Sequence, residues 1–418
     1  MRILGFSRCA LTSCAAAAML AACGGSQPPV GAQGALLQSR SNDSYTSLYS
    51  FGKGSDGQQP KAALIDVNSA LYGTTYGGGA YGDGTVFSVS TTGTEKVLYS
   101  FLGGNGSAND GANPSASLLA VKGALYGTTE YGGIASYGGC NAGTIFRIST
   151  LGVEKVVYRF YGFDCHGYFD GANPVASLVV VKGRLYGTTL NGGINEHGTV
   201  FRVSTSGSEK VLHSFELYED GANPVASLID VKGTLYGTTE EGIGVGGSSS
   251  GFGTVFAVNT AGAENVRYNF QGSDGADPAA GLININGTLY GTTAGGGAYG
   301  TAYGTYGTAF SLTTGGSFTN LHSFGSGADG SRPVARLLYV RGKLYGTTPL
   351  GGAYGKGTVF RMSLTGSNEK VLHSFGHGTD GAAPLAGLIN VTGTLYGTTS
   401  AGGTYGDGTV FALKLGSK

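Results

Sequence analysis

The chain has 418 residues, of which 80 are glycine and only 12% are charged, and its 25 basic residues balance its 25 acidic ones. A chain with zero net charge lacks the basic surface that nucleic-acid binding requires, so that class of function is excluded. A glycine content this high is typical of low-complexity segments unless the glycines recur at fixed turn positions.

The N-terminus predicts an export signal. A positively charged start precedes a short apolar, alanine-rich stretch, residues 9–20, which is too short to span a membrane. Residues 20–23, Leu-Ala-Ala-Cys, resemble the cleavage signal of bacterial lipoproteins. This resemblance implies that residues 1–22 are removed, that Cys23 is lipidated and, since Gly24 follows it, that the outer membrane is the destination. An ordinary signal peptide with an incidental cysteine is the alternative.

The next segment, residues 23–44, is rich in Gly, Gln, Ser and Pro and predicts a flexible tether. After it comes a strand-like segment, residues 46–51, whose sequence TSLYSF ends in an aromatic residue.

The motif LYGTT recurs seven times along the rest of the chain. Its copies begin at Leu71, Leu125, Leu185, Leu235, Leu289, Leu344 and Leu395. Successive copies start roughly 50 to 60 residues apart, which is the spacing of propeller blades, where one small sheet cannot bury both faces alone.

Each repeat contains four strand-like stretches separated by turn residues. The first follows a proline, as in residues 114–121, the second is LYGTT, the third is GTVF or a close variant, and the fourth ends in an aromatic residue, as in residues 96–101. Runs of β-branched and aromatic residues bounded by Gly, Asp and Pro are typical of strands and turns. We therefore expect an all-β fold over residues 45–418, a seven-bladed β-propeller with four antiparallel strands per blade.

The two ends of the repeat region complement each other. Residues 46–51 match the fourth stretch of a blade, and the last repeat stops after its third stretch, residues 408–413. We expect the N-terminal strand to complete the C-terminal blade and close the ring, which leaves no strand edge unpaired. A solenoid would not require such complementary ends.

A second motif, DG-x-x-P, contributes one aspartate to each repeat. These are Asp56, Asp110, Asp170, Asp220, Asp274, Asp329 and Asp380. Asp can hydrogen-bond its own turn, Gly can adopt positive φ and Pro directs the next strand, so a turn role explains every copy. A ring of carboxylates that holds a cation on the axis is the alternative, although the turns lack the carboxylate density of a calcium loop. We expect no metal and no cofactor.

Two cysteines follow the tether, Cys140 and Cys165, in loops expected on the same face of the second blade. We predict a disulfide between them, which suits an oxidising compartment. A metal site is the alternative and would need more ligands nearby.

The histidines divide into two groups. His213, His322 and His373 occupy the position that tyrosine holds in other repeats, so we expect them to belong to the blade framework. His166, His197 and His377 break the repeat pattern and are expected in loops on one face. Two of them, His166 and His197, fall with Asp164 and Glu196 around the junction of the second and third blades. This group is the candidate for catalysis or metal binding, and solvated surface is its alternative.

The loops after LYGTT vary in length and are rich in Gly, Tyr, Ser and Asn, as in residues 295–300. Variation concentrated on one face of a constant scaffold predicts a binding surface. Tyrosine and small polar residues give adaptable contacts at a low entropic cost.

The combination of LYGTT, a following Gly-Gly, GTVF and DG-x-x-P, in that order, resembles the GloVer tandem-repeat family of bacterial proteins with surface anchors. The resemblance covers nearly all of residues 45–418 and implies no catalytic motif, with the N-terminal lipid as the anchor. We expect a non-enzymatic binding or scaffolding propeller on the cell envelope, with a glycan or protein ligand. A carbohydrate-active lyase or hydrolase, with loop carboxylates such as Glu219, Glu240 and Glu241, is one alternative. A purely structural envelope protein is the other.

Overall fold

The computed structural model describes residues 43–103, 110–133, 141–162, 169–243, 251–300 and 306–416. Ser41–Lys418 form one compact unit. Within the described ranges every regular element is a strand. The same ranges contain no helix with the length and apolar character needed to cross a membrane.

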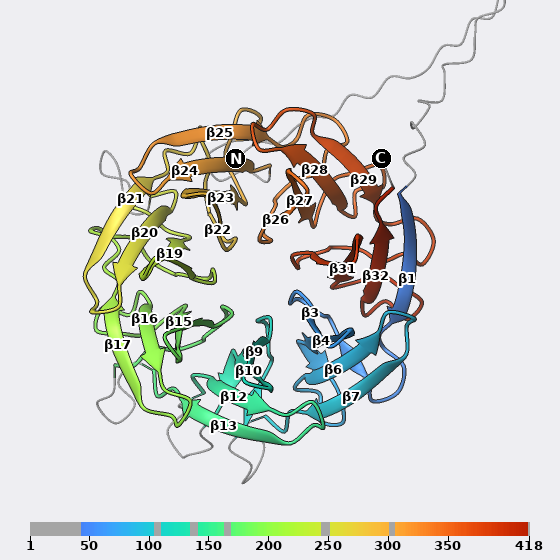
Figure 1. The fold of residues 1–418 in the computed structure, drawn as a ribbon, viewed down its shortest axis with the longest axis horizontal. Coiled ribbons are helices and arrows are strands. Elements are labelled where there is room, and N and C mark those ends of the chain that lie inside the picture. Colours follow the sequence, from blue (N-terminus) through green and yellow to red (C-terminus); the bar gives the residue numbers. More distant parts are fainter. Residues whose placement is uncertain are drawn as a thin grey trace, which may run out of the picture. The chain divides into compact units, whose positions relative to one another are not determined.

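Seven four-stranded antiparallel sheets stand around a common axis, with their first strands innermost and their fourth strands outermost (Figure 1). The first blade consists of β3 (Ile65–Val67), β4 (Ala70–Thr75), β6 (Thr85–Ser90) and β7 (Glu95–Ser100). The second consists of β9 (Leu119–Val121), β10 (Ala124–Thr129), β12 (Thr144–Ile148) and β13 (Glu154–Arg159). The third consists of β14 (Val179–Val181), β15 (Arg184–Thr189), β16 (Thr199–Val203) and β17 (Glu209–Ser214).

The fourth blade consists of β18 (Ile229–Val231), β19 (Thr234–Thr239), β20 (Thr254–Asn259) and β21 (Glu264–Asn269). The fifth consists of β22 (Ile283–Ile285), β23 (Thr288–Thr293), β24 (Thr308–Thr313) and β25 (Phe318–Ser323). The sixth consists of β26 (Leu338–Val340), β27 (Lys343–Thr348), β28 (Thr358–Ser363) and β29 (Lys370–Ser374). The seven-bladed propeller predicted from the repeats is confirmed.

The seventh blade joins the two ends of the chain. It consists of β30 (Ile389–Val391), β31 (Thr394–Thr399), β32 (Thr409–Lys414) and, as its outer strand, β1 (Ser44–Ser50). The register of β1 against β32 runs antiparallel from Ser44 opposite Lys414 to Ser50 opposite Thr409. The predicted closure is therefore confirmed, with the strand starting slightly before the predicted residues 46–51.

The glycine of LYGTT is explained by packing. In the fourth blade, a Cβ atom on Gly237 would lie 2.6 Å from Cζ of Phe256 and 2.9 Å from Cδ2 of Leu228. The aromatic ring of GTVF therefore rests directly on the glycine backbone. Phe256 also meets Phe215 of the preceding blade edge to face, with ring centroids 5.0 Å apart. The apolar core thus lies between neighbouring blades, and each blade buries the face of the next.

The two threonines of LYGTT have separate roles. The second pairs with the threonine of GTVF, and in the fourth blade the Oγ1 atoms of Thr239 and Thr254 are 2.8 Å apart. The first links blades, since the hydroxyl of Thr347 donates to the carbonyl of Ala386 at 2.9 Å. Buried hydroxyls that are satisfied in this way hold the blades in register.

Candidate functional site

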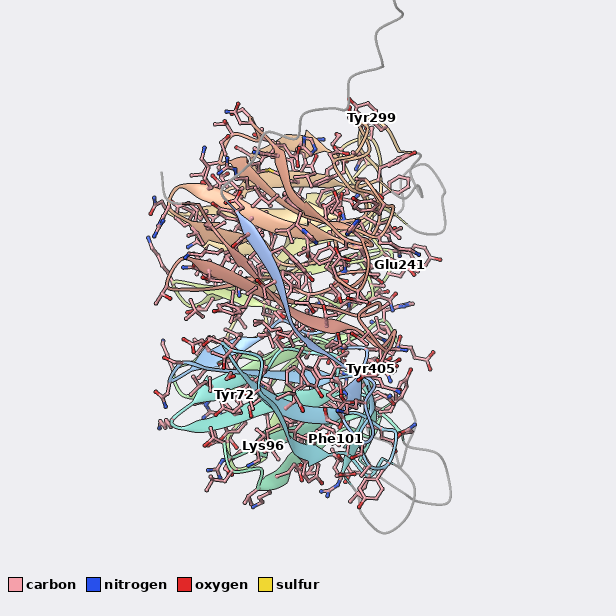
Figure 2. The ribbon with its side chains drawn as sticks, turned by 90° about the vertical axis from the view of Figure 1, so that its right-hand side faces the viewer. Tyr72, Lys96, Phe101, Glu241, Tyr299 and Tyr405 are labelled. Atoms are coloured by element: carbon pink, nitrogen blue, oxygen red, sulfur yellow. The ribbon has the colours of Figure 1, made fainter. Side chains whose placement is uncertain are left out.

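The turns between blades and the loops after LYGTT lie on one side of the ring. β2 (Gly57–Gln58) pairs with β5 (Gly77–Gly78), and β8 (Gly111–Ala112) pairs with β11 (Tyr131–Gly132). Single bridges join equivalent residues in the other blades. We call this side, made of the DG-x-x-P turns and the loops after LYGTT, the loop face. Figure 2 shows Tyr299, Glu241 and Tyr405 toward this side of the molecule.

Four exposed tyrosines stand at equivalent positions of the loop face. They follow the paired glycines after LYGTT in the fifth, sixth, seventh and first blades, which are consecutive around the ring. Their exposed fractions are 55% for Tyr299, 51% for Tyr354, 50% for Tyr405 and 60% for Tyr81. We call these four residues the tyrosine arc.

The loops that carry the tyrosine arc are fixed at their base. In the seventh blade, Gly402 and Gly403 both adopt positive φ, which turns the chain sharply before Tyr405. The N–H of Thr404 then donates to Oγ of Ser50 at 3.2 Å. The same contact forms at the other three members, from Ala80, Ala298 and Ala353. Each ring is therefore preceded by the same anchoring contact at the base of its loop, which places the four rings at equivalent positions.

A charged cavity lies where three blades meet the axis. It has a volume of about 330 Å³ and is lined by Glu240, Asp277 and Arg332 together with Ala279 and Val334. Burial and the nearby Asp277 raise the pKa of Glu240 to about 7, against the lowering effect of Arg332. The carboxyl group of Glu240 is therefore about half protonated near neutral pH. Together with the neighbouring carboxylate of Asp277 it forms a candidate acid–base pair.

A second non-repeating group lies at the axis on the side of the first two blades. Nζ of Lys61 stands 3.2 Å from the ring centroid of Tyr76, in a cation–π contact. Burial lowers the pKa of Lys61, and the neighbouring Glu130 acts in the opposite direction. Charge near the axis is therefore unevenly distributed among the blades, although the fold is repetitive.

The aspartates of DG-x-x-P serve the framework. At the junction of the first and second blades, the hydroxyl of Tyr99 donates to Oδ2 of Asp110 at 2.7 Å, and the N–H of Leu102 donates to the same atom at 3.0 Å. All seven aspartates contact the tyrosine or histidine of the preceding outer strand in this way. Each carboxylate is thus held against an outer strand of the ring, as the turn role requires.

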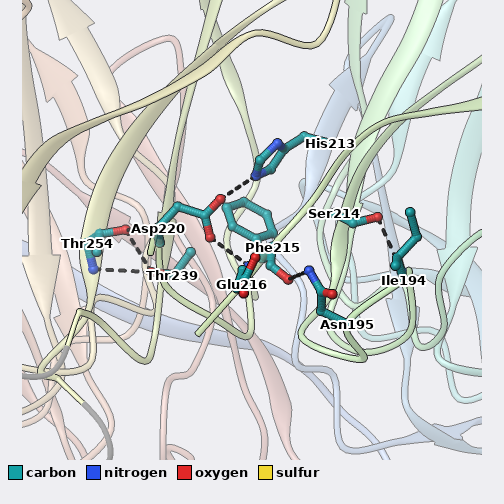
Figure 3. A network of polar contacts seen from close by, with 9 residues as sticks. All are labelled: Ile194, Asn195, His213, Ser214, Phe215, Glu216, Asp220, Thr239 and Thr254. Carbon is teal, nitrogen blue, oxygen red and sulfur yellow. Dashed lines mark hydrogen bonds and ion pairs between the residues drawn. The ribbon is translucent and has the colours of Figure 1, made fainter. Parts of the chain in front are cut away.

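His213 shows how histidine replaces tyrosine in this framework. Its Nε2 lies 2.6 Å from Oδ2 of Asp220, while the N–H of Glu216 donates to Oδ1 at 2.7 Å (Figure 3). His213 and Asp220 form a group with Glu264 of the next blade, and the possible metal-ligand atoms of these three side chains lie within 4.8 Å of one another. Tyr99, Asp110 and Glu154 form the corresponding group at the junction of the first and second blades. Because tyrosine takes the place of histidine there, the arrangement serves the framework even where no imidazole nitrogen is present.

The predicted candidates near the second and third blades lie only partly within the described residues. Glu196 is exposed with φ of 65°, and the carbonyl of His197 accepts the N–H of Asn223 at 3.0 Å. Their side chains share no hydrogen bond or ion pair in the described part of the chain. Asp164 and His166 lie outside the described residues, so the cluster as a whole stays a prediction.

Other predictions also fall outside the described ranges. These are the signal of residues 1–22, the lipidated Cys23, most of the tether of residues 23–44, and the disulfide between Cys140 and Cys165.

The sequence did not reveal the grouping of Glu240, Asp277 and Arg332. The signal that could have found it is departure from the repeat. At the fourth residue of the DG-x-x-P turn, directly before the proline, the asparagine of three repeats (Asn113, Asn173 and Asn223) is replaced by Asp277 and Arg332 in the next two.

Comparisons with known proteins agree with the fold. A family model described as the Gloeobacter/Verrucomicrobia repeat matches residues 20–247 and 242–418. Among solved structures, the chain is similar to an ancestral GH74 enzyme, with 12% identity and a TM-score of 0.54 over 88% of this chain and 49% of that one. It is also similar to a polysaccharide lyase described as a PL25 ulvan lyase, with 11% identity and a TM-score of 0.51 over 87% of this chain and 94% of that one. At such identities the likeness shows the propeller fold alone. No curated protein matches the sequence.

Proposed function

The chain belongs to the Gloeobacter/Verrucomicrobia repeat family, and we propose that it is a non-enzymatic propeller that binds glycan through its loop face. The observation that carries this proposal is the tyrosine arc, which places four half-exposed rings in register on consecutive blades. Tyrosine combines a flat apolar ring, which packs on the C–H face of a sugar, with a hydroxyl that hydrogen-bonds. The few charged residues of the chain suit a ligand that is recognised mainly by shape and stacking.

The test measures retention of the chain from Gly24 onward on immobilised bacterial and plant polysaccharides. Tyr354→Ala and Tyr405→Ala, which remove adjacent members of the arc, should each weaken binding about tenfold, since one tenfold step corresponds to about 1.4 kcal/mol. Leu151→Ala is the control, because Leu151 is 85% exposed in the turn between β12 and β13, away from the loop face. Retention that both tyrosine variants leave unchanged would contradict the proposal. Capture of a protein partner with no glycan retention would point to the protein-binding alternative.

A second candidate function is favoured by one observation. The raised pKa of Glu240, about 7, beside Asp277 gives the loop face a carboxylate pair of the kind a lyase or hydrolase uses. Each retained glycan is therefore checked for cleavage. In an enzyme, Glu240→Gln should abolish cleavage and leave retention intact, whereas in a binding protein there is no cleavage to lose. Alanine at Glu196 and His197 tests the predicted cluster by the same readout.

The proposed place of action is the cell envelope, most simply the outer membrane, with the propeller held by lipid on Cys23. The support is the sequence pattern of residues 20–23 and the tether that follows. Metabolic labelling with a clickable fatty acid should mark the wild-type chain and fail to mark Cys23→Ser. A Cys23→Ser chain that is labelled to the same extent would contradict this proposal.

A further inference from the structure

The first strands of all seven blades enclose an axial channel of about 710 Å³. The residue three positions after the proline of each DG-x-x-P motif lines this channel in all seven blades. We call this the axial position. Its occupants are Ala63, Ser117, Ser177, Ser227, Gly281, Arg336 and Gly387. Six of the seven are small, so Arg336 is the single long side chain at this level of the channel.

The neighbouring blades leave room for the arginine. Gly281 and Gly387 flank it, and a Cβ atom on Gly281 would lie 3.7 Å from Cδ of Arg336. A Cβ atom on Gly387 would lie 3.8 Å from Cβ of Arg336. The guanidinium group remains accessible to water in the channel but is surrounded by protein, and this burial lowers the pKa of Arg336. An arginine stays protonated even so.

The channel does not supply a counter-charge. Among the described residues that line it, Lys61 and Arg336 are the charged ones, and both are cations. Two first strands carry carboxylates, Asp66 in β3 and Asp230 in β18, three residues after the axial position and so about 10 Å along the chain from it. The carboxylate of Asp230 accepts the N–H of Gly233 at 2.8 Å in the turn there. A partly desolvated cation without a partner favours the binding of an anion.

Serine hydroxyls on other blades add hydrogen-bond donors. Oγ of Ser177 accepts the N–H of Ser117 at 2.9 Å, and Oγ of Ser227 accepts the N–H of Ser177 at 3.1 Å. Because these oxygens accept from the backbone, their own O–H groups are available to donate toward the axis. A cation at one side and hydroxyl donors at the axial position of three successive blades form a polar cradle within a mostly apolar channel.

We propose that the axial channel binds an oxyanion, such as the carboxylate or sulfate group of a small ligand, through the guanidinium group of Arg336 with serine hydroxyls as additional donors. Guanidinium forms paired hydrogen bonds with planar and tetrahedral oxyanions alike. The site is separate from the tyrosine arc and does not depend on glycan binding at the loop face.

The repeat itself offers a conservative test variant. Arg336→Ser places at this position the residue that three other blades carry there, so the fold should be retained. Arg361→Ser is the matched control. It removes the same charge from β28, outside the channel lining, where Ser88 and Ser311 occupy the equivalent positions in other blades.

The experiment follows binding to the purified full chain by calorimetry, with sodium sulfate and sodium glucuronate as probes and sodium chloride at equal ionic strength as the reference. Wild type and Arg361→Ser should bind at least one probe, and Arg336→Ser should bind it at least tenfold more weakly. Sulfate binding alone indicates a tetrahedral oxyanion, and glucuronate binding alone indicates a carboxylate ligand. The proposal is overturned if wild type binds neither probe beyond the chloride reference, or if Arg336→Ser binds as tightly as wild type.

Discussion

Nε2 of His213 lies 2.6 Å from Oδ2 of Asp220, and the hydroxyl of Tyr99 donates to Asp110 at 2.7 Å at the equivalent place between the first and second blades. The two side chains therefore fill one structural role, which is to fix a turn aspartate against the outer strand of the preceding blade. Each carboxylate also accepts a backbone N–H. Oδ1 of Asp220 accepts the N–H of Glu216, and Oδ2 of Asp110 accepts the N–H of Leu102. The clasp, as we call this contact, joins consecutive blades at all seven junctions.

This equivalence predicts that His213→Tyr leaves the free energy of unfolding within about 1 kcal/mol of wild type, because tyrosine restores the bond that other blades use. Asp220→Ala removes the acceptor of two donors and should cost about 2–4 kcal/mol. Chemical denaturation of both variants measures the difference. A large loss in His213→Tyr would instead indicate that the nitrogen of His213 is needed, as a metal ligand beside Asp220 and Glu264 would be.

A glutamate from the next blade approaches five of the clasps. Burial and the nearby clasp aspartate raise the pKa of Glu209 to about 8 and that of Glu95, Glu154, Glu264 and Glu369 to about 7, from an ordinary value of 4.5. Oε1 of each has no hydrogen-bond partner among the described residues. A pKa that is raised in the folded state means that the folded chain binds more protons than the unfolded chain between these values.

Stability should consequently fall as the pH rises from about 4.5 to about 8, since each of these carboxyl groups becomes charged at a buried place. Glu209→Gln, which mimics the protonated form, should raise the thermal unfolding midpoint at pH 8 and leave it unchanged at pH 5. Glu219→Gln is the control, because Glu219 is exposed. Equal midpoints of wild type and Glu209→Gln across the whole range would refute the role assigned to Glu209.

The parts of the fold that could be predicted from sequence are those determined by a local sequence motif that all seven repeats share. LYGTT and GTVF indicate the strands of each blade, and residues 46–51 indicate the closing strand, because each depends on neighbours in the chain or in the same repeat. The His213 position was predictable for the same reason, since tyrosine stands there in other repeats.

The cavity of Glu240, Asp277 and Arg332 was not predictable in this way. Its members come from different repeats and meet only because the ring brings the ends of three blades together at the axis. The same holds for Arg336. The other six repeats have a small residue at its position, but this difference points to a site only when the first strands are known to enclose a channel. Comparison of equivalent positions between repeats is the sequence signal that points to both.

Packing in the fourth blade predicts a large effect of Gly237→Ala. The added methyl group would lie 2.6 Å from Cζ of Phe256 and 2.9 Å from Cδ2 of Leu228, so the ring and the leucine must both shift. Overpacking of this kind costs about 1–3 kcal/mol and occasionally more. Denaturant unfolding measures the loss, with Gly315→Ala as the control, because the nearest atom to a Cβ there is Oγ1 of Thr313 at 3.8 Å.

A double substitution sharpens this prediction. Phe256→Leu shortens the side chain that meets the new methyl group, so Gly237→Ala should cost less in the Phe256→Leu background than in wild type. Strictly additive losses would mean that the glycine is needed for another reason.

The first threonine of LYGTT offers a comparison within one protein. The hydroxyl of Thr347 donates to the carbonyl of Ala386 in the next blade at 2.9 Å, whereas the buried hydroxyl of Thr238 has no partner among the described residues. Valine has the same shape without the hydroxyl. Thr347→Val should therefore lose about 1–2 kcal/mol, because it leaves the carbonyl of Ala386 without its donor, and Thr238→Val should be neutral or stabilising. Denaturant unfolding of the two variants distinguishes a hydrogen bond that stabilises the contact between blades from a repeat residue that merely fills space, and equal losses would show that the link from Thr347 to Ala386 contributes nothing.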